Sequence, residues 1–321
     1  MHIYDTEINP NTNLKYIFNN YIKECRYSKQ LRSQTLKSYE EVFSTFQKIM
    51  PEMEEVNDLH PYMMHEFYER LSIRERKVGK DRIAIGVKVS TIKTYYNKLM
   101  PFFRWLESKK YIEEGKLSKE IPNPPTPKYD DSKALDSVEI SQIVASISLS
   151  ATADQFRFQR DMVIVSLLLY TGIRRGELLG LRIQDVDFIN KTIHINGETS
   201  KSKKSRSIPM HYTLFTHLKS YLKLLEKRNL RTSALIVSTQ GDNPLSVHGL
   251  KHWVAKYSKL SSVKFHLHQF RHTFACSLAK KNTSITSIMR VLGHGSLQMT
   301  ERYLRSIQSE SARDGIEKLA Y

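Results

Sequence analysis

A proline-rich stretch near the middle of the chain limits the architectures that the sequence allows. Residues 121–133 hold four of the ten prolines, at positions 122, 124, 125 and 127. Proline lacks a backbone donor and favours extended chain, so this stretch predicts a spacer and not part of a core. With 321 residues the chain is long enough for two domains. We expect an N-terminal domain over residues 1–120, a linker over 121–133 and a second domain over 134–321.

The first domain is predicted to be helical, because apolar residues recur at helical spacing between about residues 13 and 115. The pattern is clearest in two sets, which comprise Leu36, Tyr39, Val42, Phe43 and Phe46, and then Ile92, Tyr95, Leu99, Phe102, Phe103 and Leu106. About a dozen residues precede the first predicted helix, too few to bury a further core. We therefore expect a small helical bundle with no extra domain before it.

The second domain is predicted to mix helices with a small sheet. It begins at a sequence typical of a capping box, Asp136 to Glu139, and continues with a buried helix at the apolar run 162–169. Residues 187–195 alternate like a strand, residues 206–209 suit a return strand, and a basic tip lies between them. The expected fold class is mainly α (α+β), with a small antiparallel sheet in the second domain.

The last fifth of the chain carries side chains suited to phosphate chemistry. His268 and Arg271 are three positions apart, so they share one face of a helix and can hold one phosphate. His294 adds a donor near a helix end, because Gly293 before it suits a cap. Tyr303 supplies an oxygen nucleophile, which needs cationic neighbours or a base because its pKa is ordinarily near 10.

Further cations stand upstream of this set. Arg174 follows the predicted buried helix directly, and the basic tip of the predicted hairpin contains Lys201, Lys203 and Lys204. A flexible tip of this kind can reach a ligand and move away from it. The chain thus supplies basic groups from three separated segments for one anionic site.

Taken in order, these residues resemble the tyrosine recombinases, or phage-type integrases. The resemblance covers residues 135–303 and includes a Thr-Gly-x-Arg-x-x-Glu-Leu pattern at residues 171–178, which identifies Arg174 and leaves Arg175 out of register. Lys201 stands eight positions before Pro209, as in Xer-like members, although hairpin slippage leaves Lys203 or Lys204 open. The His-x-x-Arg and Leu-Gly-His boxes and the tyrosine also match. The first domain resembles the family's core-binding domain more weakly, at residues 90–92 and 103–106.

The resemblance implies a catalytic set and a mechanism. The set is Arg174, Lys201, His268, Arg271, His294 and Tyr303. The tyrosine would form a 3′-phosphotyrosyl bond while the lysine protonates the departing 5′ oxygen, with no metal, cofactor or ATP. The resemblance also implies a homotetramer on two double-stranded DNA sites, and it leaves open accessory directionality proteins or host DNA-bending proteins as partners.

The charge of the chain agrees with a polyanionic partner. Its formal net charge is +17, which fits a DNA-binding protein. The charge alone fits a ribosomal or RNA-binding protein equally well. Helix starts suit phosphates, so Thr35, Lys37, Thr91 and Lys93 are candidate DNA contacts, together with Lys203 in the hairpin tip. The charged residues 73–88 form either a segment that touches DNA phosphates or a solvated basic loop. Residues 148–160 suggest no role.

Several functional alternatives stay open. Integration, excision or transposition of a mobile element is the first expected setting, and Xer-type resolution of chromosome or plasmid dimers is the second. A type IB topoisomerase and a non-catalytic DNA-binding regulator are alternatives from other classes. A zinc site at His266, His268 and His272 is not expected, because no Cys and no His-Glu-x-x-His arrangement accompanies them.

The expected compartment is the cytoplasm. The sequence has no apolar run of about eighteen residues and no signal-peptide pattern at its start. Its two cysteines, Cys25 and Cys276, lie far apart and are expected to be reduced thiols in the two cores. No membrane partner is expected.

Overall fold

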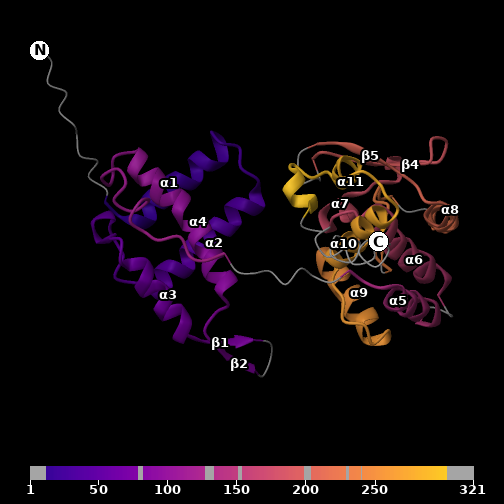
Figure 1. Cartoon of the computed structure of the whole chain (residues 1–321), viewed down its shortest axis with the longest axis horizontal. Coiled ribbons are helices and arrows are strands. Elements are labelled where there is room, and N and C mark those ends of the chain that lie inside the picture. The colour runs from indigo at the N-terminus through magenta and orange to yellow at the C-terminus, as the bar shows by residue number, and fades with distance from the viewer. Residues whose placement is uncertain are drawn as a thin grey trace, which may run out of the picture. The chain divides into compact units, whose positions relative to one another are not determined.

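The chain folds into two units, Met1–Tyr129 and Asp130–Tyr321, each with its own cluster of buried apolar side chains. The computed structural model describes residues 12–78, 82–126, 134–150, 154–198, 204–228, 231–239 and 241–301. This described part is mainly helical and has two small antiparallel sheets (Figure 1). The fold class expected from the sequence is thereby confirmed. None of the described helices is both long enough and apolar enough to span a membrane.

The first unit is a helical bundle around an aromatic core. Its elements are α1 (Leu14–Tyr27), α2 (Ser33–Ile49), a 3-10 turn (Val56–Asp58), α3 (Met63–Ile73), β1 (Glu75–Val78), β2 (Arg82–Ile85) and α4 (Val89–Ser108). Phe18 of α1 stacks on Phe43 of α2 with ring centroids 3.7 Å apart, and it meets Phe102 of α4 edge-on at 5.1 Å. The apolar periodicity therefore predicted which faces of α2 and α4 are buried, because helical spacing places such residues on one side.

The segment between α3 and α4 is a two-stranded hairpin. β1 and β2 pair antiparallel, with Glu75 opposite Ile85 and Lys77 opposite Ile83. Ile83 and Ile85 are 68% and 73% exposed, and Lys77 is exposed as well. Figure 1 shows the hairpin projecting from the end of α3. Most of its described surface therefore lies outside the core of this unit.

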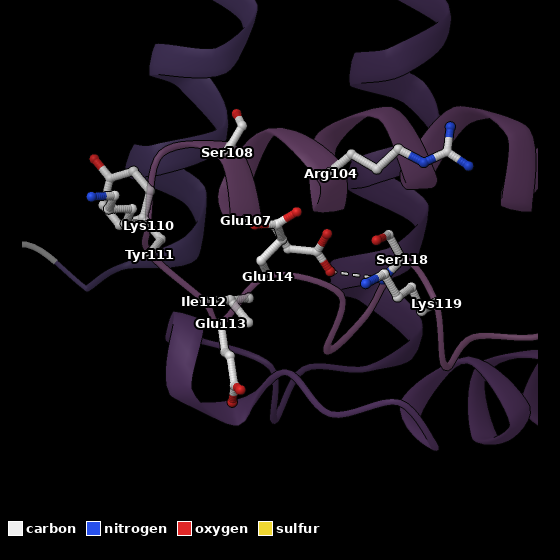
Figure 2. A pocket seen from close by; sticks show the side chains of 10 residues that line it. All are labelled: Arg104, Glu107, Ser108, Lys110, Tyr111, Ile112, Glu113, Glu114, Ser118 and Lys119. Carbon is white, nitrogen blue, oxygen red and sulfur yellow. Dashed lines mark hydrogen bonds between the residues drawn. The ribbon is translucent and has the colours of Figure 1, made fainter.

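A buried carboxylate orders the chain after α4. Glu107 is 7% exposed and accepts the backbone N–H groups of Leu117 and Ser118 at 2.8 and 2.7 Å. Burial alone would raise the pKa of Glu107, but the hydrogen bonds from Ser118 and the neighbouring backbone lower it. Figure 2 shows Glu107 and Ser118 at a pocket that Arg104 and Lys119 also line. Hydrogen bonds from the backbone therefore stabilise the buried negative charge of Glu107.

The second unit surrounds a buried helix. Its elements are α5 (Ser137–Ser150), α6 (Gln155–Thr171), α7 (Arg175–Gly180), a 3-10 turn (Ile183–Asp185), β3 (Val186–Asp187), β4 (Thr192–Ile195), β5 (Arg206–Pro209), α8 (Tyr212–Lys227), α9 (Val247–Leu260), α10 (Leu267–Lys280) and α11 (Ile285–Leu292). The predicted buried helix is α6, which packs against α5, α8 and α10. Its residues 160–168 are all buried, so it is the central element of this unit.

The small sheet has the order β3-β4-β5, with antiparallel pairing throughout. The predicted return strand at 206–209 is confirmed, but the prediction of one strand over 187–195 is wrong. The Asp187 carboxylate accepts the N–H groups of Ile189 and Asn190 at 3.0 and 2.9 Å, and Lys191 takes a positive φ of 51°. These features make a turn that separates β3 from β4, because a local side-chain acceptor competes with the strand ladder.

Two local predictions in the second unit are confirmed. Asp136 and Glu139 form a reciprocal capping box at the start of α5, with bonds of 2.9 and 2.8 Å between each backbone N–H and the other side chain. Cys276 is buried and makes no disulfide, and the same holds for Cys25 in the first unit. The capping box follows from sequence because its two side chains stand three positions apart, whereas the burial of the cysteines comes from tertiary packing.

A buried ion pair within α6 is linked to α9 by a hydrogen bond. Arg160 donates from Nε and Nη2 to Asp161 Oδ1 at 2.9 and 2.7 Å, and the side chains are 10% and 1% exposed. The hydroxyl of Tyr257 donates to Asp161 Oδ2 at 2.6 Å. The carboxylate is therefore satisfied from two helices, as a buried charge requires.

Candidate active site

The first candidate side chain, Arg174, is placed by a helix end. α6 ends at Gly172, whose φ is +58°. A Cβ atom at Gly172 would lie 2.5 Å from Phe274 Cδ1 and 2.9 Å from Leu292 Cδ2, so only glycine fits this left-handed turn. The turn reverses the chain into α7, and Arg174 is the N-cap residue of that helix.

The Arg174 guanidinium is anchored on one side. It donates from Nη1 to Glu177 Oε1 at 3.1 Å and to the Leu292 carbonyl at 3.3 Å, and from Nη2 to the Gly293 carbonyl at 3.2 Å. Its side chain keeps 20% exposure. Arg174 is therefore held in place while part of its surface remains accessible.

Helix α10 contributes His268 and Arg271 from its first turns. Arg271 is 1% exposed and donates from Nη1 to the Gly172 carbonyl at 2.8 Å and from Nη2 to the Leu292 carbonyl at 2.6 Å. It thus joins the end of α6 to the end of α11. His268 is exposed on the same helix. Their spacing of three residues places them at one site, as predicted.

Helix α11 positions His294. The helix ends at Gly293, whose φ of +64° gives the left-handed cap expected from the sequence. His294 follows directly, is 8% exposed, and its Nδ1 lies 2.8 Å from Thr300 Oγ1. Thr300 belongs to a helical segment at 297–301, the last described residues of the chain. The histidine is therefore fixed between two helical segments.

Glu177 and Arg206 are part of the site, although their pairing was not predicted. Arg206, the first residue of β5, donates from Nη1 to Glu177 Oε1 at 3.0 Å and from Nη2 to Oε2 at 2.8 Å. Its Nε donates to the Val291 carbonyl at 2.7 Å. The Glu-Leu part of the motif pointed to Glu177, but Arg206 was assigned only to a strand. The sequence around Arg206 gives no signal of this pairing, because the arginine follows two lysines and stands between two serines.

The structure brings four of the six candidate catalytic residues to one cleft of about 730 Å³. They are Arg174, His268, Arg271 and His294, and the cleft is also lined by Arg175, Lys251, His266 and Met299. All these residues belong to the second unit. A cleft with this many donors suits a phosphate group, because arginine binds it in a bidentate manner and imidazole can add a donor.

Electrostatics favour neutral imidazoles in the cleft. Burial, and then the charges of Arg271 and Arg174, lower the pKa of His294 to about 3. For His268, which is open to the cleft, local desolvation and then Arg271 lower the pKa to about 4. Burial would raise the pKa of Glu177, but the Arg206 hydrogen bond and the Arg174 backbone N–H hold it at about 2. At neutral pH the cleft therefore holds charged arginines with neutral His268 and His294, and the charged carboxylate of Glu177 lies buried beside it.

The remaining candidates fall into two groups. Lys201, Lys203 and Tyr303 lie outside the described residues, and the segment 297–301 ends two positions before Tyr303. Thr35 lies in the first turn of α2 and Thr91 in the first turn of α4, while Lys37 is exposed. Lys93 donates to Asn123 Oδ1 and to the Pro124 carbonyl, the latter at 2.8 Å, so it binds the start of the proline-rich stretch.

Groups of three or more His, Cys, Asp or Glu side chains suited to hold a metal ion are absent among the described residues. His266 and His268 both line the cleft, whereas His272 is 2% exposed in α10.

The chain matches known proteins along most of its length. Residues 133–310 match the model of the phage integrase family. A tyrosine recombinase XerC from Thermodesulfovibrio yellowstonii is 28% identical over 304 residues, which cover 91% of this chain and 92% of the relative. A tyrosine recombinase XerC from Oceanobacillus iheyensis is 30% identical over 233 residues, which cover 69% of this chain and 70% of the relative.

Solved structures show the same fold. The Tn1549 transposon integrase in complex with a circular intermediate DNA superposes with a TM-score of 0.69 at 18% identity, covering 94% of this chain and 99% of that chain. The XerH site-specific recombinase bound to its difH substrate, in a post-cleavage complex, gives a TM-score of 0.67 at 20% identity, covering 92% and 82%.

Proposed function

Because the chain belongs to the phage integrase family and is a tyrosine recombinase, an enzyme that cleaves and rejoins DNA, we propose that its cleft grips a scissile phosphate of double-stranded DNA. The observation that carries this proposal is the convergence of Arg174, Arg271, His268 and His294 on one cleft from three separate parts of the chain. Those side chains offer donors for the nonbridging oxygens, where negative charge grows as the bond breaks.

The proposed division of roles uses all six candidate residues. Arg174, Arg271 and His294 bind the nonbridging oxygens, and His268 assists proton transfer at the nucleophile or supports the arginines. Tyr303 attacks phosphorus and becomes joined to the 3′-phosphate, while Lys201 protonates the departing 5′ oxygen. The phosphotyrosyl bond conserves the energy of the broken phosphodiester, so a 5′-hydroxyl of a partner duplex can displace the tyrosine without ATP.

Each unit has a place in this proposal. The second unit, which holds the cleft, is the catalytic domain, and the first unit is the core-binding domain that adds DNA contacts near Thr35, Lys37 and Thr91. Lys93 can contribute only if it leaves the proline-rich stretch that it now binds. Four protomers act on two DNA sites, which strand exchange between duplexes requires. The net charge of +17 supports tight association with DNA.

Integration, excision or transposition of a mobile element is the proposed setting. Resolution of chromosome or plasmid dimers, which the Xer-like resemblance of the sequence implies, is the second candidate, and two relatives are named tyrosine recombinase XerC. Sequencing the DNA that remains covalently attached to the protein in cells discriminates between them. Attachment at the ends of a mobile element supports the first setting, whereas attachment at one fixed chromosomal or plasmid site supports the second.

The chemical proposal is tested with Tyr303→Phe, which removes the phenolic oxygen and keeps the ring. The substrate is a duplex that the protein selects from a random library, nicked near the cleavage point so that the attached product is trapped. The wild type should form a covalent complex on a denaturing gel, with or without a metal chelator, and Tyr303→Phe should form none while DNA binding stays within about threefold. Tyr212→Phe, an exposed tyrosine outside the cleft, is the matched control and should behave like the wild type.

Two results contradict this chemistry, namely a trapped complex with Tyr303→Phe or a requirement for added metal. Mixing two labelled duplexes, with a supercoiled plasmid assayed in parallel, then separates the classes. Exchange of label supports a recombinase, relaxation of supercoiled DNA without exchange indicates a type IB topoisomerase, and binding without a covalent complex indicates a regulator.

A further inference from the structure

A buried carboxylate lies between two arginines beside the cleft. The Glu177 side chain is 0% exposed, and Arg206 binds it with two parallel bonds of 3.0 and 2.8 Å. Arg174 shares Oε1 at 3.1 Å, and its backbone N–H donates to Oε2 at 2.9 Å. One negative charge therefore sits between two positive charges, and one of those belongs to a proposed phosphate-binding group.

An uncompensated Glu177 would oppose phosphate binding in two ways. It would compete with the phosphate for the Arg174 guanidinium, because both anions accept the same N–H groups. It would also repel the phosphate directly, and this repulsion is strong where water is excluded. A carboxylate bound to a phosphate-binding arginine therefore needs a second cation.

We propose that Arg206 is a positioning residue that neutralises Glu177 and so leaves Arg174 available for the scissile phosphate. The inference rests on the proposed function and deepens it. Arg206 supplies a full positive charge with the planar fork that matches both carboxylate oxygens. With its charge balanced, Glu177 anchors Arg174 without drawing its remaining N–H groups away from the cleft.

Arg206 acts through Glu177 and not on the DNA. Its side chain is only 9% exposed, and it does not line the cleft. Its Nε is bound to the Val291 carbonyl at 2.7 Å, and a Cβ atom at Gly293 would lie 3.0 Å from its Nη1. Arg206 thus packs against the end of α11, where the Leu292 and Gly293 carbonyls hold Arg174. The glycine before His294 leaves the room that this arrangement needs.

The test uses the full chain and single-turnover cleavage of the selected nicked duplex at saturating protein. Arg206→Gln should slow cleavage roughly ten- to a hundredfold, while DNA affinity changes by less than about threefold. Arg206→Lys, which keeps the charge without the fork, should retain clearly more activity than Arg206→Gln. The double variant Glu177→Gln/Arg206→Gln removes both charges and should cleave faster than Arg206→Gln, within about threefold of the wild type.

The pH dependence of the cleavage rate distinguishes charge balance from a purely structural role of Arg206. Without Arg206, burial should raise the pKa of Glu177 well above its wild-type value of about 2. The deficit of Arg206→Gln relative to the wild type should therefore shrink from pH 8 towards pH 5, as Glu177 takes up a proton. If Arg206 only stabilises the fold, the ratio of the wild-type cleavage rate to that of Arg206→Gln should not fall as the pH is lowered.

Arg160→Gln is the matched control, because it breaks a similar buried arginine–carboxylate pair outside the cleft. It should lower stability without slowing cleavage by the folded protein. Cleavage by Arg206→Gln at the wild-type rate overturns the inference, and so does a deficit that neither low pH nor Glu177→Gln relieves. If Arg206→Gln does not fold, the double variant Glu177→Gln/Arg206→Gln tests the inference in its place. Cleavage by the double variant as slow as that by Arg174→Ala refutes the inference. A wild type that forms no covalent complex refutes instead the proposed function.

Discussion

Burial and nearby guanidinium groups keep His294 neutral at physiological pH, although it lies in a cleft proposed to bind an anion. The pKa of about 3 applies to the protein without DNA, where the charges of Arg271 and Arg174 penalise a further positive charge. A bound phosphate would offset those charges and favour protonation. The contact of Nδ1 with Thr300 Oγ1 holds the histidine, so it is in place before DNA arrives.

The lowered pKa of His294 makes stability depend on pH. The unfolded chain protonates this histidine below about pH 6.5, whereas the folded protein does so only near pH 3, so stability falls as pH drops through this window. We expect His294→Gln to reduce the slope of the unfolding free energy against pH between 6.5 and 4.5 by up to about 1.4 kcal/mol per pH unit. Denaturant titrations of the DNA-free protein at several pH values measure this slope. The same slope in His294→Gln and the wild type would contradict a buried His294 beside the arginines.

The β1–β2 hairpin is suited to one of two roles. Its described residues include exposed Lys77 and the exposed apolar residues Ile83 and Ile85, and it immediately precedes α4, whose first turn carries Thr91. A two-stranded ribbon is narrow enough for the major groove of DNA. The alternative is a solvated basic hairpin with no ligand.

Salt dependence distinguishes these two roles of the hairpin. If Lys77 contacts a phosphate, Lys77→Ala should weaken binding to all duplexes similarly and reduce the slope of log affinity against log salt by about one. Lys116→Ala, which removes an exposed lysine from another part of the same unit, is the control. Equal slopes for the two variants would leave the hairpin as a solvated loop.

At the scale of the whole molecule, each unit has its own core. The aromatic cluster of Phe18, Phe43 and Phe102 belongs to the first unit, and the cluster around α6 belongs to the second. The second unit is closed at its start by the Leu135 N–H, which donates to Thr273 Oγ1 at 2.8 Å. A cut before residue 134 therefore preserves the described contacts of the second unit.

We expect fragments 12–126 and 134–321 each to fold alone. A domain with its own buried core unfolds cooperatively, so each fragment should show helical circular dichroism and a single sigmoidal thermal transition. Both fragments should bind DNA more weakly than the whole chain, because linked modules raise each other's effective concentration. A fragment without a cooperative transition would show that its core depends on the other unit.

Features that depend on near neighbours could be predicted from the sequence. Helical spacing located the buried faces of α2 and α4, and a continuous apolar run located the buried helix α6. Gly293 marked a helix end, and the motifs named four residues that line the cleft. The roles of Lys201 and Tyr303, which lie outside the described residues, likewise stay predictions from sequence. The strand prediction at 187–195 failed at this same local level, because a single aspartate side chain replaced ladder bonds with a turn.

The balance of charges in the site depends on contacts between residues far apart in the sequence. Glu177 and Arg206 are 29 positions apart, and Arg271 is 99 positions from the carbonyl of Gly172 that it binds. Nothing in the local pattern around Arg206 distinguishes a buried partner of Glu177 from a surface arginine. The pairing exists because α7, β5 and the end of α11 meet in space, where a buried charge must find an opposite charge and its hydrogen bonds.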